Sequence, residues 1–197
     1  MKNLVNYIKE SSNNLKEIPE DTTKAVVPVI KACRKLYNKF IDTKRAGLQN
    51  AKMIVDYITD NKLVQEYRFV TTKDYYEQYY DADSNYNPTD KKFRNKYGDI
   101  IVIDDTDTEC AYIKLKIGKT DYSEVNYGEL HNFEEAGIFV FVNNKGTVKG
   151  IANVKIKDYL KEHPEVLETT GSGQTITGVI GKYSSDDYIS GKLIASI

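Results

Sequence analysis

Apolar residues in the first third of the chain recur every three or four positions, which is the spacing of an amphipathic helix. The clearest run has its apolar positions at Val26, Ile30, Cys33, Leu36 and Phe40. A second run covers residues 48–59. Because helical side chains three and four positions apart share one face, both segments predict helices that bury one side. A weaker helical rhythm covers residues 1–16, and Pro19 after it indicates a linker that reaches Thr23.

Strand-like patterns replace the helical spacing after residue 62. Runs rich in apolar and β-branched residues occur at 63–70, 99–103, 111–117, 138–142, 147–155, 175–180 and 191–197. Between them we expect a tyrosine-rich surface helix or loop at 74–81, a helix in the second half of 122–135, and a short helix at 158–162. The fold class is therefore α+β or α/β, in which N-terminal helices precede a mixed β-sheet flanked by helices.

The expected domain organisation follows from these elements. Residues 1–23 would form an amphipathic leader and linker, and residues 24–197 a single α/β domain. Within that domain, 24–60 would be a helical front and 62–197 a sheet-rich core. A chain of 197 residues, 40% hydrophobic and 29% charged, is long enough for one well-buried core. No apolar run approaches the roughly 20 residues that span a bilayer, so we expect no membrane partner.

Two cysteines, Cys33 and Cys110, lie far apart in the sequence and predict reduced thiols in an intracellular protein. The net charge is only −1, so the chain as a whole gives no electrostatic case for nucleic acid. Its distribution is uneven, because eight basic residues and one acid, Asp42, lie between Lys24 and Lys52. The candidates for contacting nucleic acid are Lys31, Arg34, Lys35, Lys39, Lys44 and Arg45. The alternative interpretation is a solvated helix face.

Candidate chemistry lies on two adjacent predicted strands. Asp99 opens the first strand, and alternation places Tyr112, Lys114 and Lys116 on one face of the second. The order helix, strand, strand, strand, helix, strand, with this aspartate and these lysines, resembles the PD-(D/E)xK nuclease superfamily over residues 48–160. The resemblance implies a restriction-endonuclease-like fold. It also implies Mg²⁺ held by acids from the two strands and a lysine that positions the attacking water.

This sequence departs from that family at the acid of the acid-x-lysine triplet. If Lys116 is the catalytic lysine, the acid position holds Lys114; if Lys114 is the lysine, the position holds Tyr112. Some family members recruit the acid from a neighbouring helix, which Glu124 or Glu129 could supply. An active enzyme would then use Asp99, Lys114, Lys116 and Glu129 in catalysis, with Asp99 and Glu124 as ligands of Mg²⁺. Otherwise the core has no cofactor and serves for binding.

The extreme N-terminus carries a second resemblance. Residues 1–11, with sequence MKNLVNYIKES, are similar to the leader of internal head and virion proteins of tailed bacteriophages. In those proteins a protease removes the leader after an aliphatic-x-Glu triplet, and triplets ending at Glu17 and Glu20 fit this pattern. The resemblance implies a phage-encoded structural or packaged protein, located in the host cytoplasm or the virion, with phage head components and DNA as partners. An ordinary N-terminal docking helix is the alternative.

Overall fold

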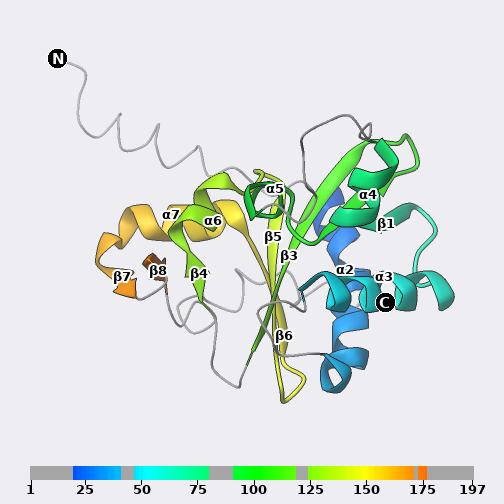
Figure 1. Ribbon diagram of the computed structural model, residues 1–197, viewed down its shortest axis with the longest axis horizontal. Coiled ribbons are helices and arrows are strands. Elements are labelled where there is room, and N and C mark those ends of the chain that lie inside the picture. The colour runs from blue at the N-terminus through cyan, green and yellow to red at the C-terminus, as the bar shows by residue number, and fades with distance from the viewer. Residues whose placement is uncertain (1–19, 41–46, 80–90, 119–123, 171–172, 177–197) are drawn as a thin grey trace.

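The computed structural model describes residues 20–40, 47–79, 91–118, 124–170 and 173–176, and these form a mixed α/β fold (Figure 1). The helices are α2 (Glu20–Leu36), α3 (Gly47–Asp60), α4 (Thr72–Tyr79), α5 (Lys91–Tyr97), α6 (Tyr127–Asn132) and α7 (Asn153–Glu162), with 3-10 helices η1 (Tyr37–Lys39) and η2 (Pro164–Val166). The strands are β1 (Tyr67–Thr71), β2 (Ile100–Asp104), β3 (Glu109–Gly118), β4 (Val125–Asn126), β5 (Gly137–Asn143), β6 (Val148–Ala152), β7 (Leu167–Thr170) and β8 (Gly173–Ile176).

The strands form two sheets. The larger has the order β1-β2-β3-β5-β6, and the smaller has the order β4-β8-β7. In the larger sheet β1, β2 and β3 are successively antiparallel, β3 and β5 are parallel, and β6 returns antiparallel to β5. The parallel β3–β5 pair needs a crossover connection, and α6 lies within it. The predicted fold class, helices followed by a mixed sheet with helices around it, is confirmed.

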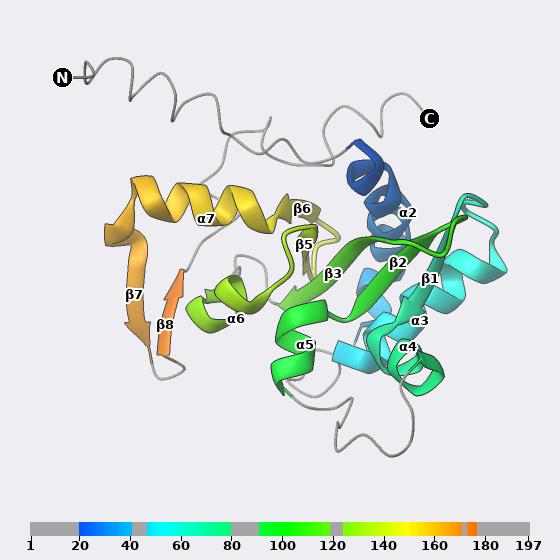
Figure 2. The ribbon, with the colours of Figure 1, turned by 90° about the horizontal axis from the view of Figure 1, so that it is seen from above.

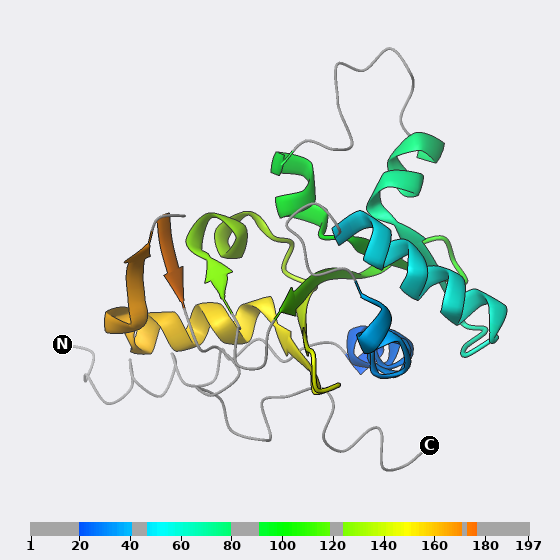
Figure 3. The same cartoon turned by 60° about the horizontal axis from the view of Figure 1, so that its bottom comes forward.

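Helices cover both faces of the larger sheet (Figure 3). One core packs α2 and α3 against alternate strand residues that include Ile113 and Leu115. The other face meets α6, α7 and the smaller sheet, where Phe139 and Phe141 of β5 are fully buried. Successive strand residues point to opposite faces of a sheet. Because Ile113 and Leu115 point to the first face, Lys114 and Lys116 lie on the second.

Several predicted boundaries were wrong. The linker was expected to reach Thr23, but α2 begins at Glu20. Thr22 is buried, and its hydroxyl donates a hydrogen bond to the carbonyl of Cys110 on β3. The strand expected at 147–155 ends at Ala152, and α7 begins at the next residue, Asn153. The reason is tertiary, because the buried Asn153 amide donates to the carbonyls of Phe133 and Glu134.

Helix α5 and strands β4 and β7 had no counterpart in the prediction. Helix α5 is short and consists mostly of polar residues, and β7 pairs only with β8. The expected strand at 63–70 is shorter, since β1 begins at Tyr67. The predicted elements at 1–16, 177–180 and 191–197 lie outside the described residues.

Both cysteines are free thiols, as expected. Cys33 is buried on α2, where burial raises its pKa, and Cys110 lies half-buried on β3. Within the described part of the chain, no helix combines the length and the apolar character needed to cross a bilayer.

Candidate functional site

Asp99 is held in place by the backbone of the neighbouring strand. Gly98 precedes it with a φ of +73°, and a side chain there would run into the carbonyl of Ile113. The Asp99 N–H donates to that same carbonyl at 2.7 Å, and the Leu115 N–H donates to Asp99 Oδ2 at 2.9 Å. Asp99 therefore faces Lys114 across the β2–β3 pair, and its carboxylate is buried, only 1% exposed.

Lys114 lies between two carboxylates. Its Nζ is 3.9 Å from Asp99 Oδ1 and 3.7 Å from Glu129 Oε1, and it also donates to the carbonyl of Arg94 at 3.3 Å. The Lys114 side chain is only 11% exposed. Because a buried ammonium needs compensating charge, these contacts explain how a lysine is tolerated on this face of the sheet.

Arg94 supplies a second cation to Asp99. It comes from α5, and its Nη2 lies 2.5 Å from Asp99 Oδ1. The first residue of α3, Gly47, lies against the same ion pair. Figure 2 shows the N-terminal end of α3 and helix α5 meeting at this end of the sheet. Elements α3, α5 and β3 thus enclose the Asp99 carboxylate.

Glu129 is positioned by the first turn of α6. The Asn126 side chain accepts a hydrogen bond from the N–H of Gly128, and the Glu129 carboxylate accepts one from the N–H of Asn126, which together form a capping box. The same carboxylate reaches back to β3, where Lys116 Nζ lies 2.5 Å from Glu129 Oε2. Glu129 therefore pairs with both lysines of the strand.

We call Arg94, Asp99, Lys114, Lys116 and Glu129 the charge cluster; it contains three cations and two carboxylates. Burial alone would raise the pKa of Asp99, but the charges of Lys114 and Arg94 and the hydrogen bonds from Arg94 and Leu115 hold it below its ordinary value. Burial opposes ionisation of Glu129 in the same way, yet Lys116 and Lys114 lower its pKa. Burial lowers the pKa of Lys114 against the opposing effect of the two carboxylates.

Tyr112, the alternative occupant of the acid position, belongs to a separate contact. Its hydroxyl donates to Glu109, and Tyr75 of α4 donates to the same carboxylate. Burial and the neighbouring Glu109 raise the pKa of Tyr112, so its phenol stays protonated. A neutral phenol is a poor ligand for Mg²⁺, which prefers carboxylate oxygens.

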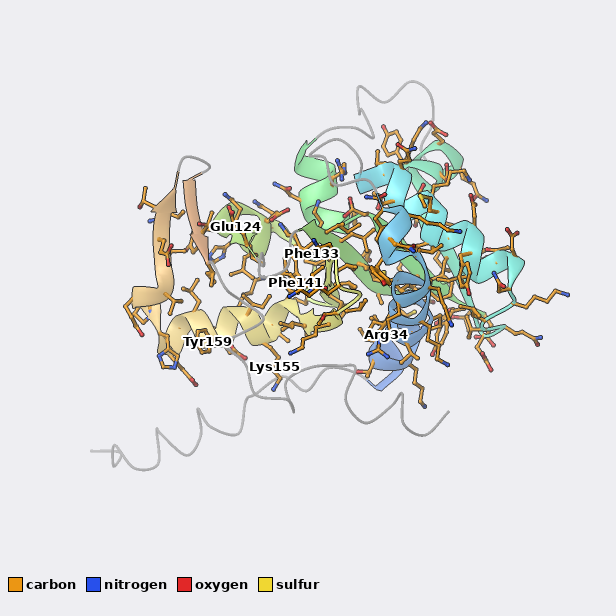
Figure 4. All side chains as sticks on the ribbon, turned by 90° about the horizontal axis from the view of Figure 1, so that it is seen from below. Arg34, Glu124, Phe133, Phe141, Lys155 and Tyr159 are labelled. Atoms are coloured by element: carbon orange, nitrogen blue, oxygen red, sulfur yellow. The ribbon has the colours of Figure 1, made fainter. Side chains whose placement is uncertain are left out.

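The described residues contain no group of three or more Asp, Glu, His or Cys side chains that could hold a metal ion. Glu124, expected as a ligand beside Asp99, directly precedes β4 and lies near α6 (Figure 4). The ion pairs with the lysines of β3 come from Glu129. The charge cluster brings together the four expected catalytic residues, but a lysine ammonium separates its two carboxylates.

The described basic residues among those expected to contact nucleic acid lie away from the charge cluster. Lys31, Arg34 and Lys35 are on α2, Lys39 ends η1, and Lys44 and Arg45 lie outside the described residues. Arg34, Lys35 and Lys39 are exposed, whereas Lys31 is half-buried. Because α2 covers the other face of the sheet, Lys31, Arg34, Lys35 and Lys39 do not join the charge cluster.

Two members of the site were missed from the sequence. The position of Asn126 could have been predicted, since an N-cap residue three positions before Glu129 matches the capping-box pattern. Arg94 had none, because its role depends on how α5 packs against β3. No protein-family model matches the chain, and no curated protein sequence is significantly similar to it.

Proposed function

We propose that this chain is a phage-encoded structural or packaged protein whose nuclease-like core binds its partner without cutting it. The nuclease-like part is supported by the order of α3, the antiparallel strands β1, β2 and β3, α6 and the parallel β5, which agrees with the order of elements in the PD-(D/E)xK superfamily. In this chain α4 and α5 are additional elements between β1 and β2, and β4 precedes α6. Asp99 at the start of the second strand and lysines on the third support it too. The phage part rests on the leader resemblance of residues 1–11, which lie outside the described residues.

The proposal that the core does not cut nucleic acid rests on one observation. The Lys114 ammonium is within 4.0 Å of both carboxylates that could bind a metal. A divalent ion 4 Å from an ammonium is opposed by roughly 8 kcal/mol at an effective dielectric constant of about 20. Mg²⁺ also loses water reluctantly and needs oxygen ligands. The positive charge of Lys114 thus compensates the two carboxylates, as a bound metal ion would otherwise do.

A Mg²⁺-dependent nuclease with a relocated acid is the second candidate. The observation that favours it is the position of Glu129, which α6 brings to 2.5 Å from Lys116 and 3.7 Å from Lys114. In that enzyme Asp99 and Glu129 would hold the metal after Lys114 had moved away from them. Lys116 would then position the attacking water.

A cleavage assay separates the two candidates. The purified chain is incubated with plasmid and single-stranded DNA in Mg²⁺ and in Mn²⁺, beside the Asp99→Asn variant. We expect both proteins to leave the DNA intact. Cleavage by the wild type that disappears in Asp99→Asn would overturn the proposal and support the relocated-acid enzyme.

The phage assignment has its own test. Mass spectrometry of the chain from purified virions should find a new N-terminus after Glu17 or Glu20. Virions that contain the chain with residues 1–20 intact would count against the leader.

A further inference from the structure

Two segments that are far apart in the sequence meet on the α2 side of the molecule. The turn between β5 and β6 packs against η1, because Gly146 has no side chain at its closest approach to Tyr37. A Cβ at Gly146 would lie 2.9 Å from Tyr37 Cε1, and the φ of +79° at this position favours glycine as well. This contact places Lys145 beside the C-terminal end of α2 and η1.

The surface around this contact is basic. Arg34 and Lys35 in the last turn of α2, Lys39 at the end of η1 and Lys145 in the turn are all exposed, and we call these four residues the basic patch. Segments 31–40 and 143–149 contain no Asp or Glu. None of the four residues of the basic patch forms an ion pair with another described residue. Figure 4 labels Arg34 near this end of α2.

Hydrogen bonds from its own backbone hold the turn that carries Lys145. The Asn143 side chain accepts hydrogen bonds from the N–H of Lys145 at 3.0 Å and of Thr147 at 2.9 Å. The exposed amides of Asn38 and Asn144 flank the basic residues. A turn whose backbone is already hydrogen-bonded has less conformational entropy to lose on binding, which favours a contact through Lys145.

We infer that the basic patch binds the phosphate backbone of a nucleic acid. Lysine, arginine and amide donors without acids match phosphate oxygens. Protein interfaces instead favour aromatic and apolar residues and are depleted in lysine. Among the described residues the one exposed large hydrophobic side chain is Tyr127 on α6, which is not part of this surface.

Nucleic-acid binding by the basic patch rests on the proposed function, in which the chain binds its partner without cutting it, and it names that partner as a nucleic acid. The basic patch belongs to the α2 side of the sheet, whereas Lys114 and Lys116 lie on the opposite face. Binding through the patch is therefore separable from the charge cluster.

Fluorescence anisotropy of the full chain with labelled DNA tests the inference. The titration uses a duplex and a single strand of about 30 nucleotides, in EDTA, over a series of salt concentrations. The patch variant combines Arg34→Gln, Lys39→Gln and Lys145→Gln. The matched control combines Lys62→Gln, Lys73→Gln and Lys161→Gln, which removes the same charge from exposed positions elsewhere. Thermal melts establish that both variants are folded.

We expect the patch variant to bind at least about tenfold more weakly at moderate salt, with its salt slope reduced by about 2 to 3 on the duplex. The control should change affinity less than about twofold. Equal weakening in both variants, no binding to either DNA, or a wild type that binds only a protein partner would overturn the inference. DNA cleavage in Mg²⁺ would instead overturn the proposed inactivity, because binding in EDTA is measured independently of it.

Discussion

The ammonium of Lys114 lies 3.9 Å from the carboxylate of Asp99, on the face of the larger sheet that carries Phe139 and Phe141. Both groups are buried, and each charge would be costly without the other. Glu129 and Arg94 complete the compensation from α6 and α5. At the position where the family resemblance implied a metal site, the structure thus has an ion-paired cluster in which a lysine lies between the two carboxylates.

The charge of Lys114 should decide whether this site binds a metal. Lys114→Glu places a third carboxylate beside Asp99 and Glu129 and removes the repelling ammonium, so we expect this variant to bind Mn²⁺ in a calorimetric titration. We expect the wild type to show no binding in the same titration. Because a ligand that binds the folded state stabilises it, Mn²⁺ should also raise the melting temperature of this variant.

The control for that experiment is Lys114→Gln, which removes the ammonium without adding an oxygen anion. It should show no Mn²⁺-dependent rise in melting temperature. If Lys114→Gln responds to Mn²⁺ as strongly as Lys114→Glu, the gain does not come from a third carboxylate.

Acid should destabilise the protein partly through the charge cluster. The pKa values of Asp99 and Glu129 lie below their ordinary values in the folded state, so their stabilising effect is full above about pH 4.5. The unfolded chain begins to bind more protons than the folded protein below that pH. The stabilisation is therefore lost as the pH falls through the lowered pKa values of Asp99 and Glu129 in the folded state. Melting temperatures between about pH 5 and 2 should fall less steeply in Asp99→Asn/Glu129→Gln than in the wild type.

A charge-matched pair serves as the comparison for the acid experiment. Asp56→Asn/Glu77→Gln removes the same two charges from exposed helix positions, where ion pairs contribute little. This variant should keep the wild-type slope. A slope that flattens equally in both double variants would mean that overall charge, and not the charge cluster, governs the acid response.

Gly98 should be intolerant of any side chain. Gly98→Ala combines an unfavourable positive φ with a Cβ only 2.8 Å from the Ile113 carbonyl carbon, and backbone cannot move aside easily. We expect a loss of about 2–4 kcal/mol in the free energy of unfolding, measured with denaturant. Gly128→Ala, where the Cβ meets only the Asn126 side chain at 3.2 Å, should stay within about 0.5 kcal/mol. Equal losses would contradict this explanation.

The capping box should contribute to the stability of α6. Asn126→Ala removes the side-chain acceptor of the Gly128 N–H and should cost about 1 kcal/mol, measured by chemical denaturation. Asn126→Ser keeps an acceptor oxygen and should recover most of that loss. No difference between the two variants would show that the cap is not what orders the first turn before Glu129.

The elements that could be predicted are those whose burial follows a simple period. Helices α2 and α3 and strands β2, β3 and β5 have long apolar patterns, because each buries a whole face against the core. Helix α5 and strand β7 lack such a pattern. The start of α7 at Asn153 was also misplaced, since a buried amide bonded to two distant carbonyls, and not periodicity, sets it.

Local periodicity was sufficient to predict the fold class, the shared face of Lys114 and Lys116, and the place of Asp99 next to the start of β2. The contacts of Glu129 and Arg94 with these residues, and the packing of Gly146 against Tyr37, could not be predicted without the three-dimensional structure. Ion pairs and packing depend on the distances between elements. Strand pairing and helix packing set those distances, and the spacing of residues in the sequence does not encode them.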